Sequence, residues 1–112
     1  MRVLDGEQIL VRIFIGESDQ WKKRPLADAL LERLRREGFA GATVLRGVAG
    51  FGAHSVVHTA NILRLSQDLP VVLEIVDTEE KMQELLAILD EMVPEGLVTM
   101  EKVRVVKYSM RP

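Results

Sequence analysis

The chain contains no cysteine, which excludes disulfide bonds and thiolate metal sites and fits a reducing environment. It also has no block of one charge sign, because its 15 basic and 17 acidic residues are mixed and give a formal net charge of -2. That balance provides no general attraction to nucleic acid or to anionic lipid. No stretch approaches the ~20 apolar residues of a membrane span, and the amino terminus lacks a signal-peptide run. We therefore expect a cytoplasmic protein that neither inserts into membranes nor binds nucleic acid.

The composition is that of one globular domain over residues 1–112, with 47% hydrophobic and 29% charged residues. Hydrophobic periodicity predicts the element order β-α-β-β-α-β. The predicted strands are residues 8–16, 42–46, 71–76 and 97–108, and the predicted helices are residues 25–37 and 78–93. Residues 53–69 fit either a short helix or a structured loop.

Two local signals refine the last two elements. Asp77 stands where a helix N-cap belongs, and Glu80 follows at the spacing of a capping box. In the last strand the apolar alternation changes phase at Glu101 and Lys102, which predicts a β-bulge at that point.

The element order matches a ferredoxin-like βαββαβ fold of the α+β class, an antiparallel four-stranded sheet with two helices on one face. Because helices cover only one face, the apolar residues of the other face would meet water, which monomers rarely allow. We therefore expect identical chains to pack sheet against sheet, with Arg12 and Glu74 able to pair within that interface. The apolar residues of the uncovered face include Leu10, Phe14, Val72 and Val76.

Four of the eight glycines fall within residues 41–52, beside Arg46 and ahead of two histidines. Clustered glycine indicates backbone that bends sharply or approaches a ligand closely, so residues 46–68 form the candidate functional region. Gly47, Gly50 and Gly52 are candidate ligand contacts, and each fits equally well as a bulge or tight-turn residue.

Arg46 and Arg64 are the candidate anion-binding side chains of this region. A guanidinium group suits a phosphate or a carboxylate of a ligand. The alternative for Arg46 is an ion pair with Asp68 or Glu74 across adjoining strands, and Arg64 has the same two interpretations.

Asp19 and Trp21 lie between the first predicted strand and the first predicted helix. Trp21 is a candidate for stacking on a base or ring, and Asp19 for accepting a hydrogen bond from that ligand. Tryptophan also serves as a packing or interface anchor, and this alternative stays open.

His54 and His58 stand four residues apart, a spacing that puts two imidazoles on one helix face. No third ligand precedes Asp68, so we expect no metal site and interpret His58 as a ligand-stacking or polar loop residue. No serine lies in a nucleophile elbow, and no Ser-His-Asp order or carboxylate pair has catalytic spacing. We expect a protein that is not an enzyme; the open alternative is a catalytic site shared between chains.

Four motifs follow one another along the chain: Gly16-Glu-Ser-Asp-x-Trp21-x-x-x-Pro25-Leu26, Gly41-Ala-Thr-Val-Leu-Arg-Gly47-x-x-Gly50-Phe-Gly52, Ile62-Leu-Arg-Leu-Ser66-x-Asp68-Leu-Pro70 and Glu74-Ile-Val-Asp77. Together they resemble the uncharacterised PII-like family known as domain of unknown function 190, over residues 7–108. The resemblance implies a ferredoxin-like fold of the nitrogen-regulatory PII type and a homotrimer with ligand clefts between subunits. It also implies a long mobile loop between the second and third strands, at residues 47–68.

The chain departs from the nucleotide-binding PII proteins that it resembles. Their phosphate-holding turn before the last strand is rich in glycine and lysine, whereas residues 93–97 here read Val-Pro-Glu-Gly-Leu. A nucleotide would instead use Arg46, Arg64, Arg104 or the lysines of the connector after the first strand. The loop contains no tyrosine, so the tyrosine-modification switch of some PII proteins does not carry over.

These observations predict a trimeric PII-like sensor or regulator that binds a small anionic metabolite, such as an adenine nucleotide, between subunits. Ligand binding would order the loop for docking on a partner protein. The family's association with fluoride exporters implies a membrane channel or transporter as that partner. The alternative is a metal-tolerance-like or structural trimeric adaptor without a small-molecule ligand, and no cofactor identity follows from the sequence.

Overall fold

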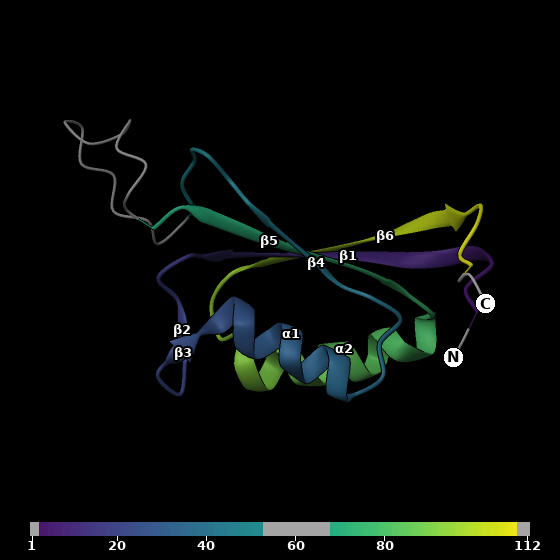
Figure 1. The fold of residues 1–112 in the computed structure, drawn as a ribbon, viewed down its shortest axis with the longest axis horizontal. Coiled ribbons are helices and arrows are strands. Elements are labelled where there is room, and N and C mark those ends of the chain that lie inside the picture. The colour runs from purple at the N-terminus through teal and green to yellow at the C-terminus, as the bar shows by residue number, and fades with distance from the viewer. Residues whose placement is uncertain (1–2, 53–67, 110–112) are drawn as a thin grey trace.

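An antiparallel four-stranded sheet and two helices form the two layers of this computed structural model, which describes residues 3–52 and 68–109 (Figure 1). The strands lie in the order β4-β5-β1-β6, and both helices cover the same face of the sheet. This is the predicted ferredoxin-like arrangement. The strands are β1 Gly6–Gly16, β4 Thr43–Arg46, β5 Pro70–Asp77 and β6 Leu97–Val105, and the helices are α1 Leu26–Arg36 and α2 Glu79–Met92.

The connection between β1 and α1 contains a small hairpin that the sequence did not predict. β2 Gln20–Trp21 and β3 Arg24–Pro25 pair antiparallel around a turn at Lys22 and Lys23. Strands of two residues have no measurable alternation, so periodicity identifies only a polar connector here. The hairpin leads directly into α1, whose N-cap residue is Pro25.

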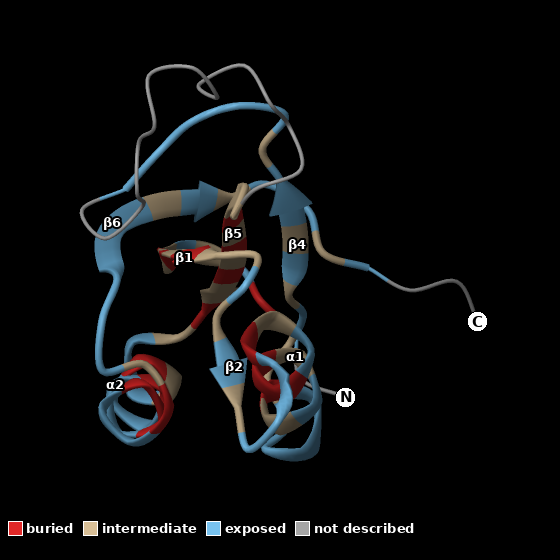
Figure 2. Cartoon of the chain, turned by 90° about the vertical axis from the view of Figure 1, so that its left-hand side faces the viewer, coloured by how far each residue is buried: buried red, intermediate tan, exposed pale blue. Residues whose placement is uncertain are grey.

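The core lies between the sheet and the helices, and Figure 2 shows its buried residues facing one another across the two layers. Alternate residues of β1 and β5 point toward the helices, as the period of two requires. Burying one such aliphatic side chain contributes about 1.5–3 kcal/mol, so this layer supplies most of the stability. The most deeply buried members are Val11, Ile13, Leu30, Leu34, Leu73, Ile75, Met82 and Leu85. Among the described residues, neither helix combines the length and the apolar composition needed to cross a membrane.

The N-cap of α2 is Thr78, so the prediction of Asp77 was wrong by one residue. The Thr78 hydroxyl accepts a hydrogen bond from the Lys81 backbone N–H at 3.1 Å. Asp77 is instead the last residue of β5 and is fully buried. Its carboxylate accepts hydrogen bonds from the backbone N–H groups of Thr78 at 2.7 Å and Ala40 at 2.9 Å. The carboxylate therefore joins the connection between α1 and β4 to the start of α2.

The bulge predicted in β6 is absent. β6 pairs with β1 in one uninterrupted register, from Gly6 opposite Val105 to Phe14 opposite Leu97. Because directly paired residues point to the same face, Val98 and Met100 lie on the helix-covered side. Val103 and Val105 lie on the other side. The change of phase in the sequence therefore moves the apolar residues from one face of a regular strand to the other.

The face of the sheet away from the helices has an apolar row that crosses all four strands. The strand registers place Leu45 beside Val72, Val72 beside Phe14, and Phe14 beside Leu97. Leu45 is 47% exposed and Leu97 is 57% exposed. We call these four residues the open-face row. Leu10, which we expected to be exposed on this face, is buried instead, in the register position between Val76 of β5 and Glu101 of β6. The other predicted residues of this apolar surface, Phe14, Val72 and Val76, are half-buried in the single chain.

Arg12 joins three strands on the same face. Its guanidinium group donates to Glu74 of β5 at 2.8 Å and to Glu101 of β6 at 2.9 Å. The hydrogen bond to Glu74, followed by the one to Glu101, raises the pKa of Arg12. The predicted pairing of Arg12 with Glu74 is confirmed, and it forms within one chain.

The helices are joined at their surface by an ion pair that makes stability depend on pH. Arg33 of α1 donates to Glu91 of α2 at 3.1 Å, and this hydrogen bond lowers the pKa of Glu91. A lowered carboxyl pKa stabilises the fold above the ordinary glutamate value of about 4.3, and the contribution disappears as pH falls through the folded value. In urea unfolding, the free energy of unfolding should fall between neutral and acidic pH for both proteins. We expect this fall to be smaller for Glu91→Gln than for the wild type. Identical pH profiles for the two proteins would contradict this expectation.

Candidate functional site

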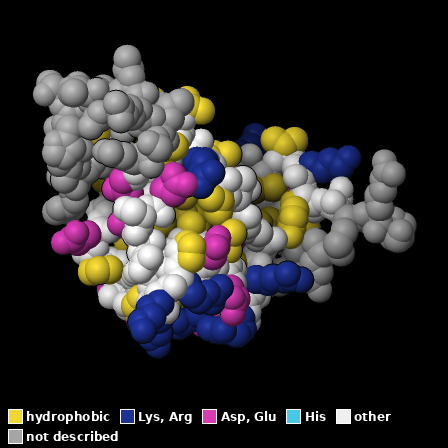
Figure 3. All heavy atoms as spheres, turned by 60° about the vertical axis from the view of Figure 1, so that its left-hand side comes forward, with side chains coloured by type: hydrophobic (Ala, Val, Ile, Leu, Met, Phe, Trp, Pro, Cys, Tyr) yellow, Lys and Arg dark blue, Asp and Glu magenta, His cyan; other side chains and the backbone are white. Residues whose placement is uncertain are grey.

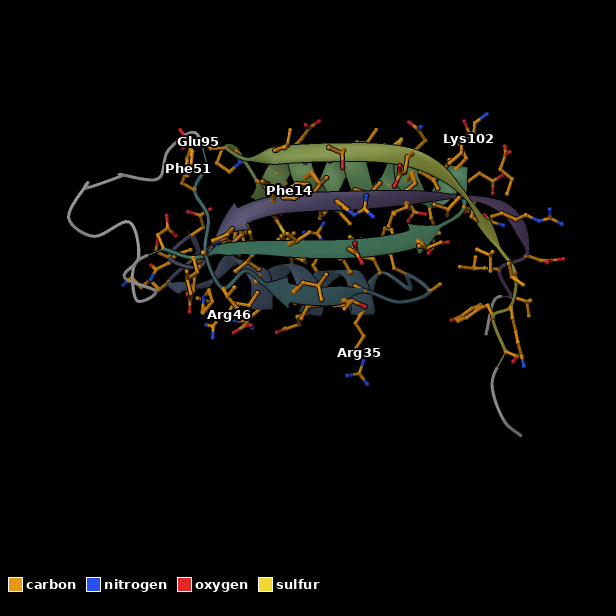
Figure 4. The ribbon with its side chains drawn as sticks, turned by 90° about the horizontal axis from the view of Figure 1, so that it is seen from above. Phe14, Arg35, Arg46, Phe51, Glu95 and Lys102 are labelled. Atoms are coloured by element: carbon orange, nitrogen blue, oxygen red, sulfur yellow. The ribbon has the colours of Figure 1, made fainter. Side chains whose placement is uncertain are left out.

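A cavity of about 480 Å³ lies at the end of the sheet where β1 finishes and β5 and β6 begin. We call it the end pocket. Four chain segments meet there: the end of β1 with its following turn, the glycine segment after β4, the start of β5, and the turn between α2 and β6. Figure 4 shows Phe14, Phe51 and Glu95 at this end of the sheet. The lining residues are Phe14, Ile15, Gly16, Asp19, Phe51, Gly52, Asp68, Pro70, Glu95, Gly96 and Leu97.

Asp19 shapes the turn that follows β1. Its carboxylate accepts a hydrogen bond from the Gly16 N–H at 2.9 Å, and its carbonyl accepts one from the Leu26 N–H at 2.8 Å. A carboxylate that accepts from a nearby backbone N–H is the usual way aspartate stabilises a turn. Asp19 therefore sets the geometry of this turn and also contributes to the wall of the end pocket.

Asp68 ties the start of β5 to the same turn. The Asp68 carboxylate accepts hydrogen bonds from the Ser18 N–H at 3.0 Å and the Ser18 hydroxyl at 2.7 Å. The backbone adds a third bond, from the Glu17 N–H to the Leu69 carbonyl at 2.8 Å. Gly16 leaves room for this contact, because a Cβ there would lie 2.3 Å from an Asp68 carboxylate oxygen. Two motifs about fifty residues apart in sequence thus form one wall of the pocket.

The glycine segment packs against Pro70 on the other side of the pocket. The Gly47 N–H donates to the Pro70 carbonyl at 2.7 Å, and a Cβ on Gly47 would lie 2.7 Å from the Pro70 ring. Gly50 has φ +145°, a conformation that favours glycine, and also approaches this ring. Gly52 is the predicted glycine that lines the pocket. The sharp turns and close approach predicted for this cluster are therefore present, with Pro70 as the neighbour.

Arg46 does not line the end pocket and instead pairs with Glu17. Neither of the two partners that we expected is used, because Asp68 accepts from Ser18 and Glu74 pairs with Arg12. The pair joins the end of β4 to the turn after β1, which explains why a charged residue ends this edge strand. The Arg46 side chain keeps most of its surface exposed.

Trp21 lies away from Asp19, in a second and smaller cavity. Its ring packs against the core, with the Lys22 ammonium group 5.3 Å from the ring centroid. The cavity has a volume of about 150 Å³ and lies between the β2–β3 hairpin and the helices. We call it the arginine pocket, because Arg24, Arg33 and Arg36 line it with Trp21. The structure thus separates two residues that the sequence suggested would share one ligand.

His58 and Arg64, together with His54, lie outside the described residues, so their predicted roles stay predictions. The described residues contain no group of three or more histidine, aspartate or glutamate side chains arranged to hold a metal ion.

Sequence reasoning missed several walls of the end pocket. Phe14, Phe51, Asp68 and Glu95 all line it, yet none was a candidate. Asp68 belongs to a motif that carried the family resemblance, which was the one available signal for it. Phe51 also belongs to such a motif, between Gly50 and Gly52, whereas Phe14 and Glu95 lie in other segments of the chain. The described lining contains the carboxylates of Asp19, Asp68 and Glu95 but no lysine or arginine. The pocket therefore offers apolar surface and hydrogen-bond acceptors, and the charge of an anionic ligand must be balanced by groups beyond this lining.

The fold, a four-stranded antiparallel sheet with two helices on one face, is that of the PII-like proteins. CPII from Thiomonas intermedia K12, in complex with ADP, AMP and acetate, has a TM-score of 0.65 at 16% identity, covering 91% of both chains. The same protein with ADP and bicarbonate gives a TM-score of 0.62 at 19% identity, covering 90% of both chains. A protein from Thermus thermophilus, named as PII-like and signalling, gives 0.61 at 24% identity, covering 92% of this chain and 94% of that one.

The sequence identifies the family within this class. Residues 8–105 match DUF190, described as Uncharacterized ACR, and the chain belongs to this family. A UPF0166 protein from Aquifex aeolicus (strain VF5) is 38% identical over 106 residues, covering 95% of this chain and 98% of the relative. The resemblance drawn from the four motifs is thereby confirmed.

Proposed function

We propose that this protein is a PII-like regulator that binds a small anionic ligand of the adenine nucleotide class and has no enzymatic activity. The end pocket is the observation that carries the proposal. CPII, which shares the fold, is known in complex with ADP and AMP. The end pocket has the apolar surface that a purine ring needs, since Phe14, Phe51 and Leu97 line it.

The aromatic and the acidic residues of the lining suit different parts of a nucleotide. Aromatic side chains stack on a base, and the carboxylates of Asp19 and Asp68 accept hydrogen bonds from ribose hydroxyl or amino groups. The phosphates carry negative charge and are repelled by these carboxylates. We place them at the mouth of the pocket, where basic side chains of a neighbouring subunit supply the balancing charge.

A homotrimer provides such a neighbour. The open-face row leaves Leu45 and Leu97 half-exposed in the single chain, and this row reaches the end pocket through Phe14 and Leu97. Packing a second copy on the row removes this apolar surface from water and adds a further wall to the pocket. The ligand site then lies between subunits.

The segment between β4 and β5 is the proposed contact for a partner protein, such as a membrane channel or transporter. Its two described ends, at Gly52 and Asp68, both line the end pocket. A ligand that touches both ends interacts with this segment directly, and it shifts the populations of the segment if it binds one arrangement better than another. This coupling makes the protein a sensor.

Calorimetry with ADP and AMP on the full chain tests the proposal through Phe51. We expect Phe51→Ala to weaken nucleotide binding about tenfold, because base–aromatic stacking contributes about 1–3 kcal/mol. Phe51 is 76% exposed, so its removal leaves the core intact. Val48→Ala is the matched control, since Val48 is 78% exposed in the same segment and does not line the end pocket.

The absence of heat with either nucleotide, or equal weakening by Phe51→Ala and Val48→Ala, would contradict the proposal. An assembled protein that binds no nucleotide would favour the structural adaptor.

A further inference from the structure

The arginine pocket combines basic side chains with an apolar floor. Arg24 comes from β3, whereas Arg33 and Arg36 come from the last turns of α1. Trp21 and Met92 form the floor, and Glu32 is the acidic residue of the lining. Figure 3 shows lysine and arginine side chains gathered at the lower part of this side of the molecule. Three guanidinium groups thus surround one small hollow that holds a single carboxylate.

The existing ion pairs leave positive charge available. Arg24 pairs with Glu32 at 2.8 Å, and Arg33 pairs with Glu91 at 3.1 Å and with Glu37 at 3.7 Å. Arg36 forms no ion pair with any residue that the structure describes. The charge of Lys22, at the tip of the hairpin, acts on Glu91 as well and lowers its pKa further. The lining residues carry three positive charges and one negative charge, and Arg36 is the guanidinium group among them without an ion-pair partner in the described chain.

The hairpin beside the pocket has an unfavourable turn. Lys22 has φ +48° and Lys23 has φ +68°, so both lysines adopt the left-handed conformation. Two-residue hairpins of this geometry favour Asn-Gly, because side chains are strained at these angles. Strained residues that persist often mark a functional site. Of these two lysines, Lys22 lies beside the pocket, with its ammonium group 5.3 Å from the centroid of the Trp21 ring.

We propose that the arginine pocket binds the phosphate group of a small molecule. Its volume of about 150 Å³ is below the range of about 300–1,000 Å³ typical of whole-ligand sites, so it fits one group and not a nucleotide. Guanidinium groups present paired N–H donors that match phosphate oxygens, and no described residue accepts from the donors of Arg36. The arginine pocket shares no lining residue with the end pocket and is a separate site.

The fluorescence of Trp21 tests the proposal, because Trp21 is the single tryptophan of the chain and lines this pocket. We expect inorganic phosphate, titrated into the full chain at constant ionic strength, to give a saturable change that chloride does not give. Arg36→Gln is expected to weaken phosphate binding about tenfold, the effect of losing one charge-assisted hydrogen bond. Glu32→Gln is expected to strengthen it a few-fold, because it removes the carboxylate that competes for Arg24.

Arg35→Gln is the matched control. It removes the same charge from the next residue of α1, yet Arg35 lines a different cavity, beside Phe39, and projects away from the sheet (Figure 4). We expect it to change phosphate affinity less than twofold. Equal weakening by Arg35→Gln and Arg36→Gln would show general surface charge and overturn the proposal, as would an unsaturable response of the wild type.

A second titration identifies the source of the phosphate group. Glycerol 3-phosphate binding more tightly than inorganic phosphate indicates a phosphorylated metabolite, and the reverse order indicates the free ion. Both results support a phosphate site. A response to acidic peptides or nucleic acid without any response to the two phosphates would overturn it. None of these outcomes depends on nucleotide binding in the end pocket, which Phe51→Ala reports separately.

Discussion

The Val72→Lys variant is expected to sediment as a particle of 12.6 kDa, whereas the wild type is expected to sediment at three times that mass. Val72 lies in the middle of the open-face row, between Leu45 and Phe14. A lysine there points into water in the single chain, next to the carboxylate of Glu74 on the same face. In a trimer the same lysine would be buried against apolar side chains of another copy, and burying an unpaired charge is strongly unfavourable.

The control for this prediction is Leu86→Lys, which places the same charge at an exposed apolar residue of α2. Leu86 lies on the helix layer, away from the open-face row, so this variant should keep the wild-type mass. Circular dichroism and thermal unfolding establish that both variants are folded. A wild type that sediments at 12.6 kDa at micromolar concentration would contradict the trimer, and so would a trimeric Val72→Lys protein.

The largest loss of stability is expected for Gly96→Ala, in the turn between α2 and β6. Gly96 has φ +152°, and a Cβ there would lie 2.9 Å from the Phe14 carbonyl oxygen. The backbone conformation disfavours any side chain, and the carbonyl belongs to the central strand, which cannot shift easily. We expect the two effects together to lower the free energy of unfolding by about 3 kcal/mol. For a domain of this size the midpoint of thermal unfolding would fall by roughly 10 °C.

Variants of two other glycines separate the effect of the backbone conformation from the effect of the close contact. Gly6 has φ +70° with open space around it, so Gly6→Ala tests the backbone conformation alone and should cost about 1 kcal/mol. Gly41 has neither feature, so Gly41→Ala should change stability by less than about 0.5 kcal/mol. All variants are compared at one protein concentration, because assembly raises apparent stability. Equal losses for Gly96→Ala and Gly6→Ala would contradict the close contact with Phe14.

Periodicity in the sequence predicted the four strands of the sheet and both helices, most directly for β1, β5, α1 and α2, each of which has one face buried in the core. The same reasoning failed for the β2–β3 hairpin, whose strands have two residues each. It also placed the start of α2 one residue early. Asp77 and Thr78 are both good N-caps, and local preference cannot choose between them. The choice depends on Ala40, whose backbone N–H donates a hydrogen bond to the Asp77 carboxylate. Thr78 then caps the helix.

Prediction was less complete for the candidate site. Asp19 and Gly52 do line the end pocket, whereas Trp21 lies in the arginine pocket and Arg46 pairs with Glu17. These outcomes depend on which segments the sheet brings together, and spacing along the chain does not report that. Phe51 is an example, since nothing in its sequence neighbourhood shows that it will meet the turn before β6.

The sequence by itself determined the order of the elements, the aliphatic core and the existence of an apolar face without helices. These properties follow from the spacing of residues within single elements, which a local pattern records. Only the tertiary structure decided which polar groups meet, as Ser18 and Asp68 do. It also decided that acidic residues line the end pocket while basic residues line the separate arginine pocket. The physical reason is the strand order β4-β5-β1-β6, which brings segments far apart in the chain to the same end of one sheet.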